Sequence, residues 1–163
     1  MPRSGCLHIA TALAIARVDG ISSVLLVASR YANHALPLWT LPGGRQQPGE
    51  LLAGTAIREL REETALNATA GELAYLSESY DGETHVLNAT FCVNLTDARA
   101  PRRPESGDHV VDAAWVPIEQ LASRIAVAIV RDPLLAYVRG NLTRRYAGYR
   151  EAGVTIRWPE EEL

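Results

Sequence analysis

The sequence predicts a single α/β domain in which a mixed β-sheet lies between helices. Two observations lead to this fold class. Bulky and small apolar residues alternate from Cys6 to Ala16, the period of two that is typical of a strand, whereas a segment of helical length runs from about Glu50 to Thr64. Strand-like and helix-like segments continue to interchange along the 163 residues, and this order is typical of an α/β/α sandwich.

The first half of the chain is expected to contain two strands, a long loop and a helix. The alternation over Cys6–Ala16 produces one face of large side chains and one face of alanines, and a second strand is expected over Ser22–Ser29. Arg30–Gly49 is rich in proline and glycine and is interpreted as a loop. Pro48 and Gly49 interrupt regular structure immediately before the helix.

The second half begins with a predicted β-hairpin. Strand-like patterns cover Glu72–Tyr80 and Thr84–Leu95, and Asp81-Gly82 between them is a strong turn signal. A polar loop and a further strand are then expected, over Thr96–Asp108 and Val110–Val116.

Two helices are expected toward the end of the chain. Pro117 is placed to open a short helix, because proline is favoured in a first helical turn. Asp132 is placed to cap a longer helix, with Pro133 in its first turn, that runs to about Arg150. A last short strand is expected over Val154–Trp158.

Composition excludes several classes of protein. The formal net charge is −3, so the chain has no basic footprint for nucleic acid, and no stretch is long and apolar enough to span a membrane. Cys6 and Cys92 match no metal knuckle or redox pair, and we expect two buried free thiols rather than a disulfide. These observations favour a cytoplasmic protein of one domain, residues 1–163, in which residues 132–163 form a C-terminal helical extension.

Three glutamates carry the strongest chemical signal. Glu59, Glu62 and Glu63 stand at positions i, i+3 and i+4 of the predicted helix, so they share one face. Like charges at this spacing repel each other, and a cation is expected to compensate them. Carboxylate oxygens suit Mg²⁺ or Mn²⁺, which also bind phosphate oxygens of a substrate. A solvated acidic helix face is the alternative for any one of these glutamates taken alone.

The residues around these glutamates resemble the Nudix box, the motif of the MutT-like Nudix hydrolase family. The matching positions are Gly44, Glu50, Arg58, Glu59, Leu60, Glu62, Glu63 and Leu66. The preceding segment, Trp39 to Gly44, also resembles the usual lead-in to that box. The family's fold, an α/β/α sandwich, would cover nearly the whole chain.

The resemblance implies a Mg²⁺-dependent enzyme, with Mn²⁺ as a substitute, that cleaves the diphosphate linkage of a nucleotide. Its substrate would be a nucleoside di- or triphosphate or a derivative such as a nucleotide sugar or ADP-ribose. The implied metal ligands are Glu59, Glu62, Glu63 and the backbone carbonyl of Gly44. Arg58 would orient the box by pairing with Glu50, and Glu62 is the first candidate for the general base.

Many relatives place another acidic residue outside the box. Asp112 is the candidate here, because it precedes Trp115 in a segment that resembles the family's late strand and the short helix after it. Glu105 and Asp108 compete for this role, and an ordinary loop residue is the alternative for each of them.

Residues that contact the small-molecule nucleotide are less specifically indicated. Arg30, at the end of the second strand, and Arg45, next to the box glycine, are candidates for binding phosphate. Tyr31, His34 and Tyr80 are candidates for stacking on a base. Surface arginines and aromatic core residues are the alternatives. Trp39 is expected to pack the loop before the box.

One position departs from the family's pattern. Ala65 stands where the family has a glycine that leaves the helix in a left-handed conformation, and Asn67 is expected to adopt that conformation instead. The resemblance also leaves two other functions open: a Nudix-fold nucleotide-binding regulatory module without catalysis, and an isomerase of isoprenoid diphosphates. A homodimer is consistent with it as well, since many relatives are dimers.

Overall fold

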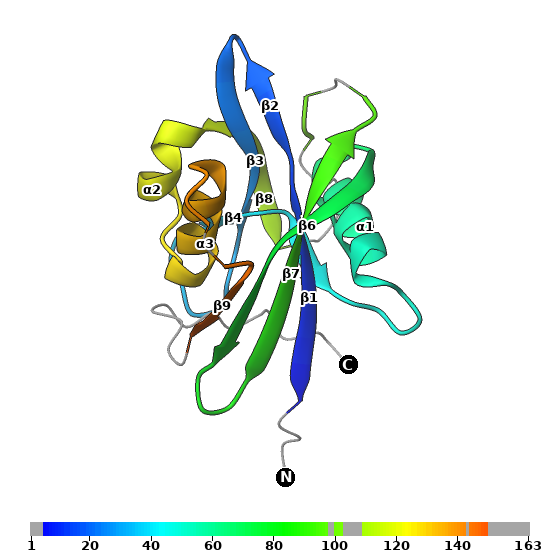
Figure 1. Cartoon of the computed structure of the whole chain (residues 1–163), viewed down its shortest axis with the longest axis vertical. Helices are drawn as coiled ribbons and strands as arrows, with labels where there is room; N and C mark the ends of the chain where they lie inside the picture. The colour runs from blue at the N-terminus through cyan, green and yellow to red at the C-terminus, as the bar shows by residue number, and fades with distance from the viewer. Residues whose placement is uncertain (1–4, 98–99, 103–108, 143, 150–163) are drawn as a thin grey trace.

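The structure, a computed structural model, describes residues 5–97, 100–102, 109–142 and 144–149. Two β-sheets occupy its centre. One side is covered by α1 (Leu52–Thr64), and the other side by α2 (Leu121–Arg124) and α3 (Ala128–Val138) (Figure 1). The predicted α/β class, with strands between helices, is confirmed. The strands form two sheets where the sequence predicted one.

Sheet A is a mixed sheet of five strands in the order β5-β1-β7-β6-β9. The strands span Cys6–Leu13 (β1), Gly43–Arg45 (β5), Ala68–Tyr80 (β6), His85–Leu95 (β7) and Tyr146–Tyr149 (β9). β1 runs parallel to β7 and antiparallel to β5, whereas β6 and β7 are antiparallel. β1 therefore joins the segment before the helix to the later hairpin.

Sheet B is built around β3. Its strands span Ile15–Val18 (β2), Ile21–Ser29 (β3), Leu38–Thr40 (β4) and Val110–Pro117 (β8). β8 pairs with one edge of β3, and β2 and β4 pair with the other edge. Val24, Leu25 and Leu26 of β3 are fully buried, as expected of a central strand with both faces covered.

The chain crosses between the two sheets at two adjacent points. Ala14 alone separates β1 from β2, and Leu41 and Pro42 separate β4 from β5. The crossings contact each other, because the Ala12 amide donates a hydrogen bond to the Pro42 carbonyl at 2.9 Å. The expected loop over Arg30–Gly49 therefore contains two strands of three residues each, which are too short for a periodic pattern to reveal.

The small face of β1 lies under α1. Ala10 and Ala12 form one core cluster with Ala56 and Leu60 of the helix, and all four are fully buried. Alanine side chains let the helix approach the sheet closely. The bulky face of β1, represented by Leu13, belongs to the second core beneath α2 and α3. The alternation along β1 thus separates the two cores.

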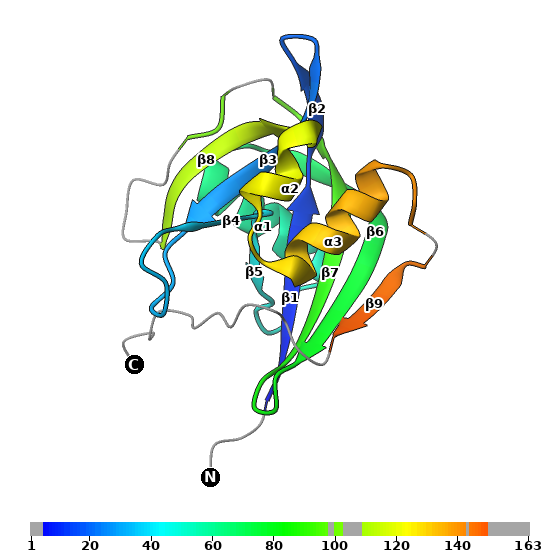
Figure 2. The same ribbon diagram turned by 90° about the vertical axis from the view of Figure 1, so that its left-hand side faces the viewer.

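The helices on the other side are short. Figure 2 shows α2 and α3 lying in front of the strands, where Leu121, Ile125 and Leu134 are fully buried. A 3₁₀ turn, η1 (Ile118–Gln120), follows Pro117 and leads into α2, so the predicted short helix is confirmed. Within the described residues, no helix has the length and apolar character needed to cross a bilayer.

The longer C-terminal helix differs from the prediction. α3 begins at Ala128 and ends at Val138, so Pro133 lies inside it and Asp132 does not cap it. It ends in a Schellman turn, in which Gly140 has φ of 70° and Asn141 N donates to Ala136 O at 2.8 Å. The chain then forms β9 where the prediction extended the helix. The strand predicted over residues 154–158 lies outside the described residues.

The predicted hairpin is confirmed. β6 and β7 pair antiparallel, from Tyr80 and His85 next to the turn to Ala68 and Leu95 at the far end. β6 begins at Ala68, which is before the predicted start at Glu72. Asp81 closes the turn, because its Oδ1 accepts hydrogen bonds from the amides of Glu83 at 2.9 Å and Thr84 at 2.7 Å. This is the side-chain turn for which aspartate is favoured.

Both cysteines are free, as expected, but only one of them is shielded. Cys92 is partly buried on β7, where its Sγ lies 2.9 Å from Oη of Tyr137. Cys6 is exposed at the start of β1, so the expectation of two buried thiols is wrong for this residue. Cys6 is exposed because it lies outside the part of β1, around Ala10 and Ala12, that packs against α1.

The exit of α1 is formed by Ala65 and not by Asn67. Ala65 has φ of 61° and ψ of 13°, and its amide donates to the carbonyl of Arg61. Among the described non-glycine residues, only Asp19 and Ala65 have positive φ. The helix thus retains the left-handed exit that the family's glycine would provide, with the steric cost of an alanine side chain.

We expect Ala65→Gly to stabilise the protein by roughly 1 kcal/mol, because glycine adopts the left-handed conformation without strain. The free energy of unfolding in urea measures the effect. Ala53→Gly, in the first turn of α1, is the control and should destabilise by up to about 1 kcal/mol, since glycine is less favourable than alanine in a helix. Equal destabilisation by both changes would contradict the strain assigned to Ala65.

Candidate functional site

Arg58 lies at the centre of the acidic face of α1. Its Nε donates to Oε1 of Glu50 at 2.7 Å, and its Nη1 donates to Glu59 at 2.9 Å and to Glu62 at 3.1 Å. Its Nη2 donates to Oε2 of Glu50 and to the carbonyl of Arg45, each at 3.1 Å. One guanidinium therefore compensates three carboxylates, with the paired geometry toward Glu50 that arginine favours.

Glu50 fixes the loop before the helix to the helix itself. Its Oε2 accepts hydrogen bonds from Oγ1 of Thr55 at 2.7 Å and from the amide of Gln47 at 3.1 Å. The hydrogen bond with Arg58 lowers the pKa of Glu50 to about 2, and the same bond raises the pKa of Arg58. Glu50 is therefore ionised at any pH at which the protein would work.

We expect the Glu50–Arg58 pair to stabilise the fold only above moderately acidic pH. The pKa of Glu50 is about 2 in the folded protein and 4.5 ordinarily, so its contribution is fully present above about pH 4.5 and is lost as the pH falls toward 2. The difference in unfolding free energy between wild type and Glu50→Gln should therefore shrink over this interval in urea titrations. Glu119→Gln, at an exposed position, is the control. A Glu50→Gln difference independent of pH would contradict the pairing.

The three glutamates of the predicted site have different environments. Glu63 is 1% exposed, whereas the side chains of Glu59 and Glu62 are 15% and 51% exposed. Glu63 therefore lies inside the protein, Glu59 lies at the boundary, and Glu62 reaches solvent. Burying a carboxylate beside two others is costly unless positive charge is close to it.

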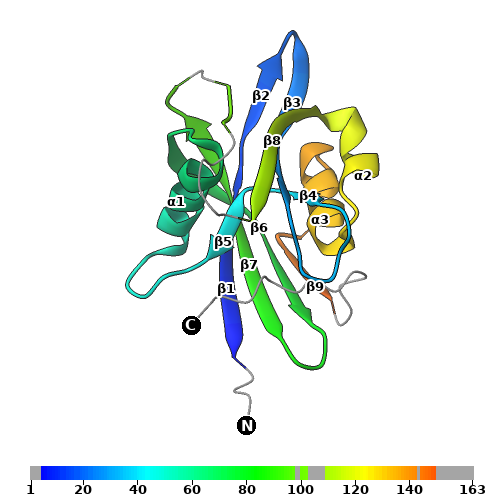
Figure 3. The ribbon, with the colours of Figure 1, turned by 180° about the vertical axis from the view of Figure 1, so that it is seen from behind.

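Gly44 of β5 lies directly against Glu59. A Cβ atom at Gly44 would be 2.5 Å from both Cδ and Oε1 of Glu59, so only glycine permits this approach. Figure 3 shows the strand beside α1, viewed from behind. The loop backbone and a helix carboxylate thus meet at one point.

These groups suit a divalent cation but are not assembled around one. Among the described residues, no three His, Cys, Asp or Glu side chains are arranged to hold a metal ion. Glu59 and Glu62 are paired with Arg58 in this arrangement. Carboxylates beside a glycine backbone are the hard oxygen donors that Mg²⁺ and Mn²⁺ prefer, so the residues present fit such an ion.

Tyr31 differs from its expected role. It follows β3 and is only 6% exposed, so it is not available to stack on a base. Burial, together with the negative charge of Glu63, raises the pKa of Tyr31 to about 12, and its hydroxyl is hydrogen-bonded to the side chains of Ser29 and Thr40. Tyr31 therefore belongs to the packed interior beside Glu63.

Residues 7–138 match the family model described as the NUDIX domain. The chain belongs to the Nudix family. The matched segment begins in β1 and ends at the last residue of α3, so it includes both sheets apart from β9. The helix face that carries Arg58 lies within the matched segment.

Individual Nudix proteins resemble the chain at moderate identity. The MutT4 mutator protein of Mycobacterium tuberculosis, whose assignment is itself provisional, is 29% identical over 120 residues, which is 68% of this chain and 47% of that protein. The chain thus spans about half the length of this relative.

Solved Nudix structures share the fold. The MutT protein of Methanosarcina mazei Go1 superposes with a TM-score of 0.69 at 23% identity, covering 88% of this chain and all of that chain (100%). The NUDIX domain of Shewanella oneidensis NrtR, solved with ADP ribose, gives a TM-score of 0.67 at 25% identity, covering 85% of this chain and 90% of that chain.

Of the two predicted phosphate-binding arginines, Arg45 lies inside the Nudix box and Arg30 precedes it, directly after β3. Arg45 is exposed at the end of β5, and its carbonyl is bonded to Arg58. Arg30 is exposed between β3 and Tyr31, and its amide donates to the carbonyl of His109 at 2.8 Å.

The other predicted contacts, Tyr80 and Asp112, lie on strands that follow the box in the chain. Tyr80 lies at the tip of the β6–β7 hairpin, remote from α1 (Figure 1), and its hydroxyl donates to the Gly82 carbonyl at 3.0 Å. Asp112 is exposed on β8, opposite Ala28 in the register, and its Oδ1 accepts a hydrogen bond from the Ala113 amide. Glu105 and Asp108 lie outside the described residues.

Sequence reasoning missed two supporting residues. Thr55 bonds Glu50, as described above, and Arg124 of α2 lies 5.2 Å from the ring centre of Trp39. Trp39 itself is partly buried against the second core, in the strand that precedes the box. No spacing pattern relates Arg124 to Trp39, because their contact depends on how α2 packs against sheet B.

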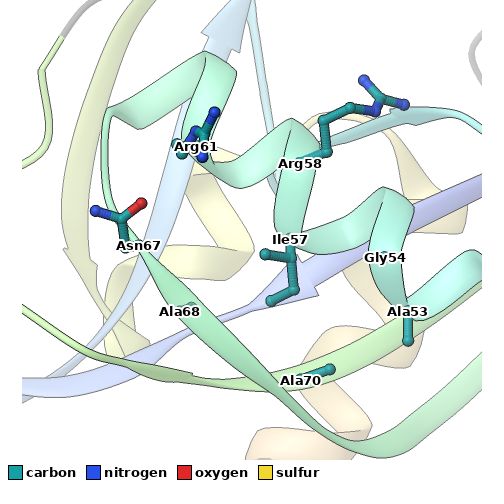
Figure 4. A pocket seen from close by; sticks show the side chains of 8 residues that line it. All are labelled: Ala53, Gly54, Ile57, Arg58, Arg61, Asn67, Ala68 and Ala70. Carbon is teal, nitrogen blue, oxygen red and sulfur yellow. The ribbon is translucent and has the colours of Figure 1, made fainter.

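A separate groove of about 500 Å³ lies between α1 and β6 (Figure 4). Its lining residues are Ala53, Gly54, Ile57, Arg58, Arg61, Asn67, Ala68 and Ala70. Ile57 points into the groove, whereas the guanidinium of Arg58 points away from it. The lining contains no carboxylate, so this groove is distinct from the acidic face.

Proposed function

We propose that this Nudix protein is a divalent-metal-dependent hydrolase that cleaves the diphosphate linkage of a nucleoside di- or triphosphate or a nucleoside diphosphate derivative. The observation that carries the proposal is the single guanidinium of Arg58, which joins Glu50 to Glu59 and Glu62. A helix face that only needed to be soluble would not require a partly buried ion-pair network of this kind.

Each box residue then has a distinct role. The metal ligands would be Glu59, Glu62, Glu63 and the Gly44 carbonyl. A Mg²⁺ or Mn²⁺ ion held by these residues would polarise phosphoryl oxygens and would lower the pKa of a water bound to it. Arg58 and Glu50 tie the helix that carries the three glutamates to the loop that follows Gly44.

Glu62 is the proposed general base. Its side chain is half exposed, so water reaches it, and Arg58 holds its Oε2 at 3.1 Å. A carboxylate that is solvated and positioned in this way can accept a proton from an attacking water. Asp112 remains the candidate outside the box, and Arg30 and Arg45 are the proposed phosphate contacts.

Nucleotide binding without catalysis is the second candidate function, and one comparison supports the binding of a nucleotide. The NUDIX domain of NrtR, of similar fold, was solved with ADP ribose. The retained Glu59, Glu62 and Glu63 favour the enzyme, because a binding module has no need of three metal-binding carboxylates.

A substrate panel tests the proposal. It contains nucleoside di- and triphosphates, nucleotide sugars, ADP-ribose and diadenosine polyphosphates, each with Mg²⁺, with Mn²⁺ or with a chelator. We expect metal-dependent turnover in wild type and in the control Glu119→Gln, and a loss of at least about 100-fold in Glu62→Gln. Tight nucleotide binding without any turnover would instead favour the binding module.

A further inference from the structure

A row of polar side chains crosses the face of sheet A that is opposite α1. The register places Thr11 of β1 beside Thr90 of β7, and Thr90 beside Tyr75 of β6, so the three share one face. Asn88 lies two residues before Thr90 on that same face, beside Ser77. Toward α3 this face is apolar, and it becomes polar at this row.

The row forms a continuous hydrogen-bonded chain. The Tyr75 hydroxyl is bonded to Thr90, and Oγ1 of Thr90 lies 2.7 Å from Oγ1 of Thr11. Thr11 in turn donates to Oδ1 of Asn88 at 3.4 Å. Tyr75 and Thr90 are 3% and 0% exposed, whereas Asn88 is only partly buried. The hydrogen-bonded row thus begins in the core and ends at the partly buried Asn88.

Such a network holds its last member in one orientation. Buried hydroxyl groups are costly unless they are bonded, so each hydroxyl restrains its neighbour. When Thr11 donates to Oδ1, the two N–H groups of Asn88 point elsewhere. Asn88 therefore presents hydrogen-bond donors from a rigid sheet, and a site on a strand is more precise than one on a loop.

The row also lies beside the box. Thr11 is paired with Gly43 and Ile9 with Arg45 of β5, while Ile9 is paired with Asn88 on its other side. Two strand spacings, on the order of 10 Å, therefore separate Arg45 from Asn88. Arg45, Ile9 and Asn88 are neighbours in one row of the register and therefore share a face, so a nucleotide whose phosphates lie near Arg45 would extend its nucleoside past Ile9 toward Asn88.

We propose that Asn88, held by Thr11, hydrogen-bonds the nucleobase of the substrate and helps to determine which base is accepted. The inference rests on the proposed function, because it requires a nucleotide in the site. A carboxamide carries both donors and an acceptor, so it can pair with the polar edge of a base. Thr11 and Thr90 act through Asn88 and are positioning residues.

Equilibrium binding by calorimetry tests the inference. The ligands are the four nucleoside diphosphates and ADP-ribose, with inorganic pyrophosphate as the base-free probe. For the nucleotide that wild type binds best, Asn88→Ala should weaken binding about tenfold, the loss of one good hydrogen bond, and leave pyrophosphate binding unchanged. The matched control is Asn94→Ala, an exposed asparagine of the same strand, which should change neither.

Two further variants separate base recognition from support of the fold. Asn88→Asp offers only acceptors, so it should change the order of preference among the bases and favour those with amino groups. Thr11→Val should weaken binding of the best nucleotide while sparing pyrophosphate. Unchanged preference in Asn88→Asp, or equal losses for nucleotide and pyrophosphate, would overturn the inference alone. Wild type that binds no nucleotide at all would overturn the proposed function with it.

Discussion

Replacing Arg58 by lysine is expected to lower both the stability and the activity of the protein. A lysine ammonium cannot reproduce the bidentate pair with Glu50 while also reaching Glu59 and Glu62, so repelling carboxylates would be left partly buried. We expect a loss of about 2 kcal/mol in the free energy of unfolding, below the values for fully buried pairs. The rate of metal-dependent hydrolysis should fall at least about 100-fold, because the ligands lose their alignment.

Arg61→Lys is the matched control for this change. Arg61 lies on the same helix with an exposed side chain, and its substitution should alter stability by less than about 0.5 kcal/mol and leave hydrolysis unchanged. Urea denaturation and initial-rate measurements on both variants give the comparison. If Arg58→Lys behaved like Arg61→Lys, the guanidinium would not organise the site.

Substitution of the two adjacent glycines of β5 should separate metal binding from folding. In Gly44→Ala the new methyl group would lie 2.5 Å from the carboxylate carbon of Glu59, which is the movable end of a side chain. The fold can therefore adjust at a cost of less than about 1 kcal/mol, but Glu59 leaves the point where a metal would bind. We expect at least about 100-fold slower hydrolysis and weaker Mn²⁺ binding by calorimetry.

Gly43→Ala should mainly lower the stability of the protein, whereas Gly44→Ala should mainly lower hydrolysis and metal binding. Its methyl group would lie 2.5 Å from the carbonyl oxygen of Ala10 and 2.9 Å from Cα of Thr11, both of which are backbone atoms of the central strand. The strands would have to separate, so we expect destabilisation of about 2 kcal/mol or more in urea denaturation. Equal loss of stability in the two variants would show that Glu59 is fixed, and would contradict its proposed freedom to bind metal.

Local sequence signals predicted the elements whose cause is local. The Asp81-Gly82 turn, the two faces of β1 and the helix that carries the box depend on neighbours within a few residues. The Schellman turn that ends α3 at Gly140 has a local cause too, but the prediction placed the start of the helix at Asp132 and Pro133 and extended the helix past Gly140 to about Arg150. The parallel pairing of β1 with β7 joins segments that are far apart in the chain, so a pattern within a short stretch of sequence cannot predict it.

The sequence predicted that the glutamates of the site share one helix face, but it did not predict how deeply each of them is buried. Spacing alone placed Glu59, Glu62 and Glu63 on one helix face, whereas their unequal exposure depends on strands from other parts of the chain. The same reason explains Tyr31, which lies inside because β3, β4 and α1 meet around it. The row that ends at Asn88 depends on strand register, which a single sequence does not reveal.

The two crossings between the sheets, at Ala14 and at Leu41-Pro42, restrict how the sheets can move relative to each other. Because the chain passes from sheet to sheet through links of one and two residues, and the Ala12 amide bonds the Pro42 carbonyl, the sheets share a stiff pivot. Gly43 and Gly44 follow that pivot immediately. A change in the angle between the two sheets, including one caused by a ligand between them, would therefore change the position of Gly44 relative to Glu59.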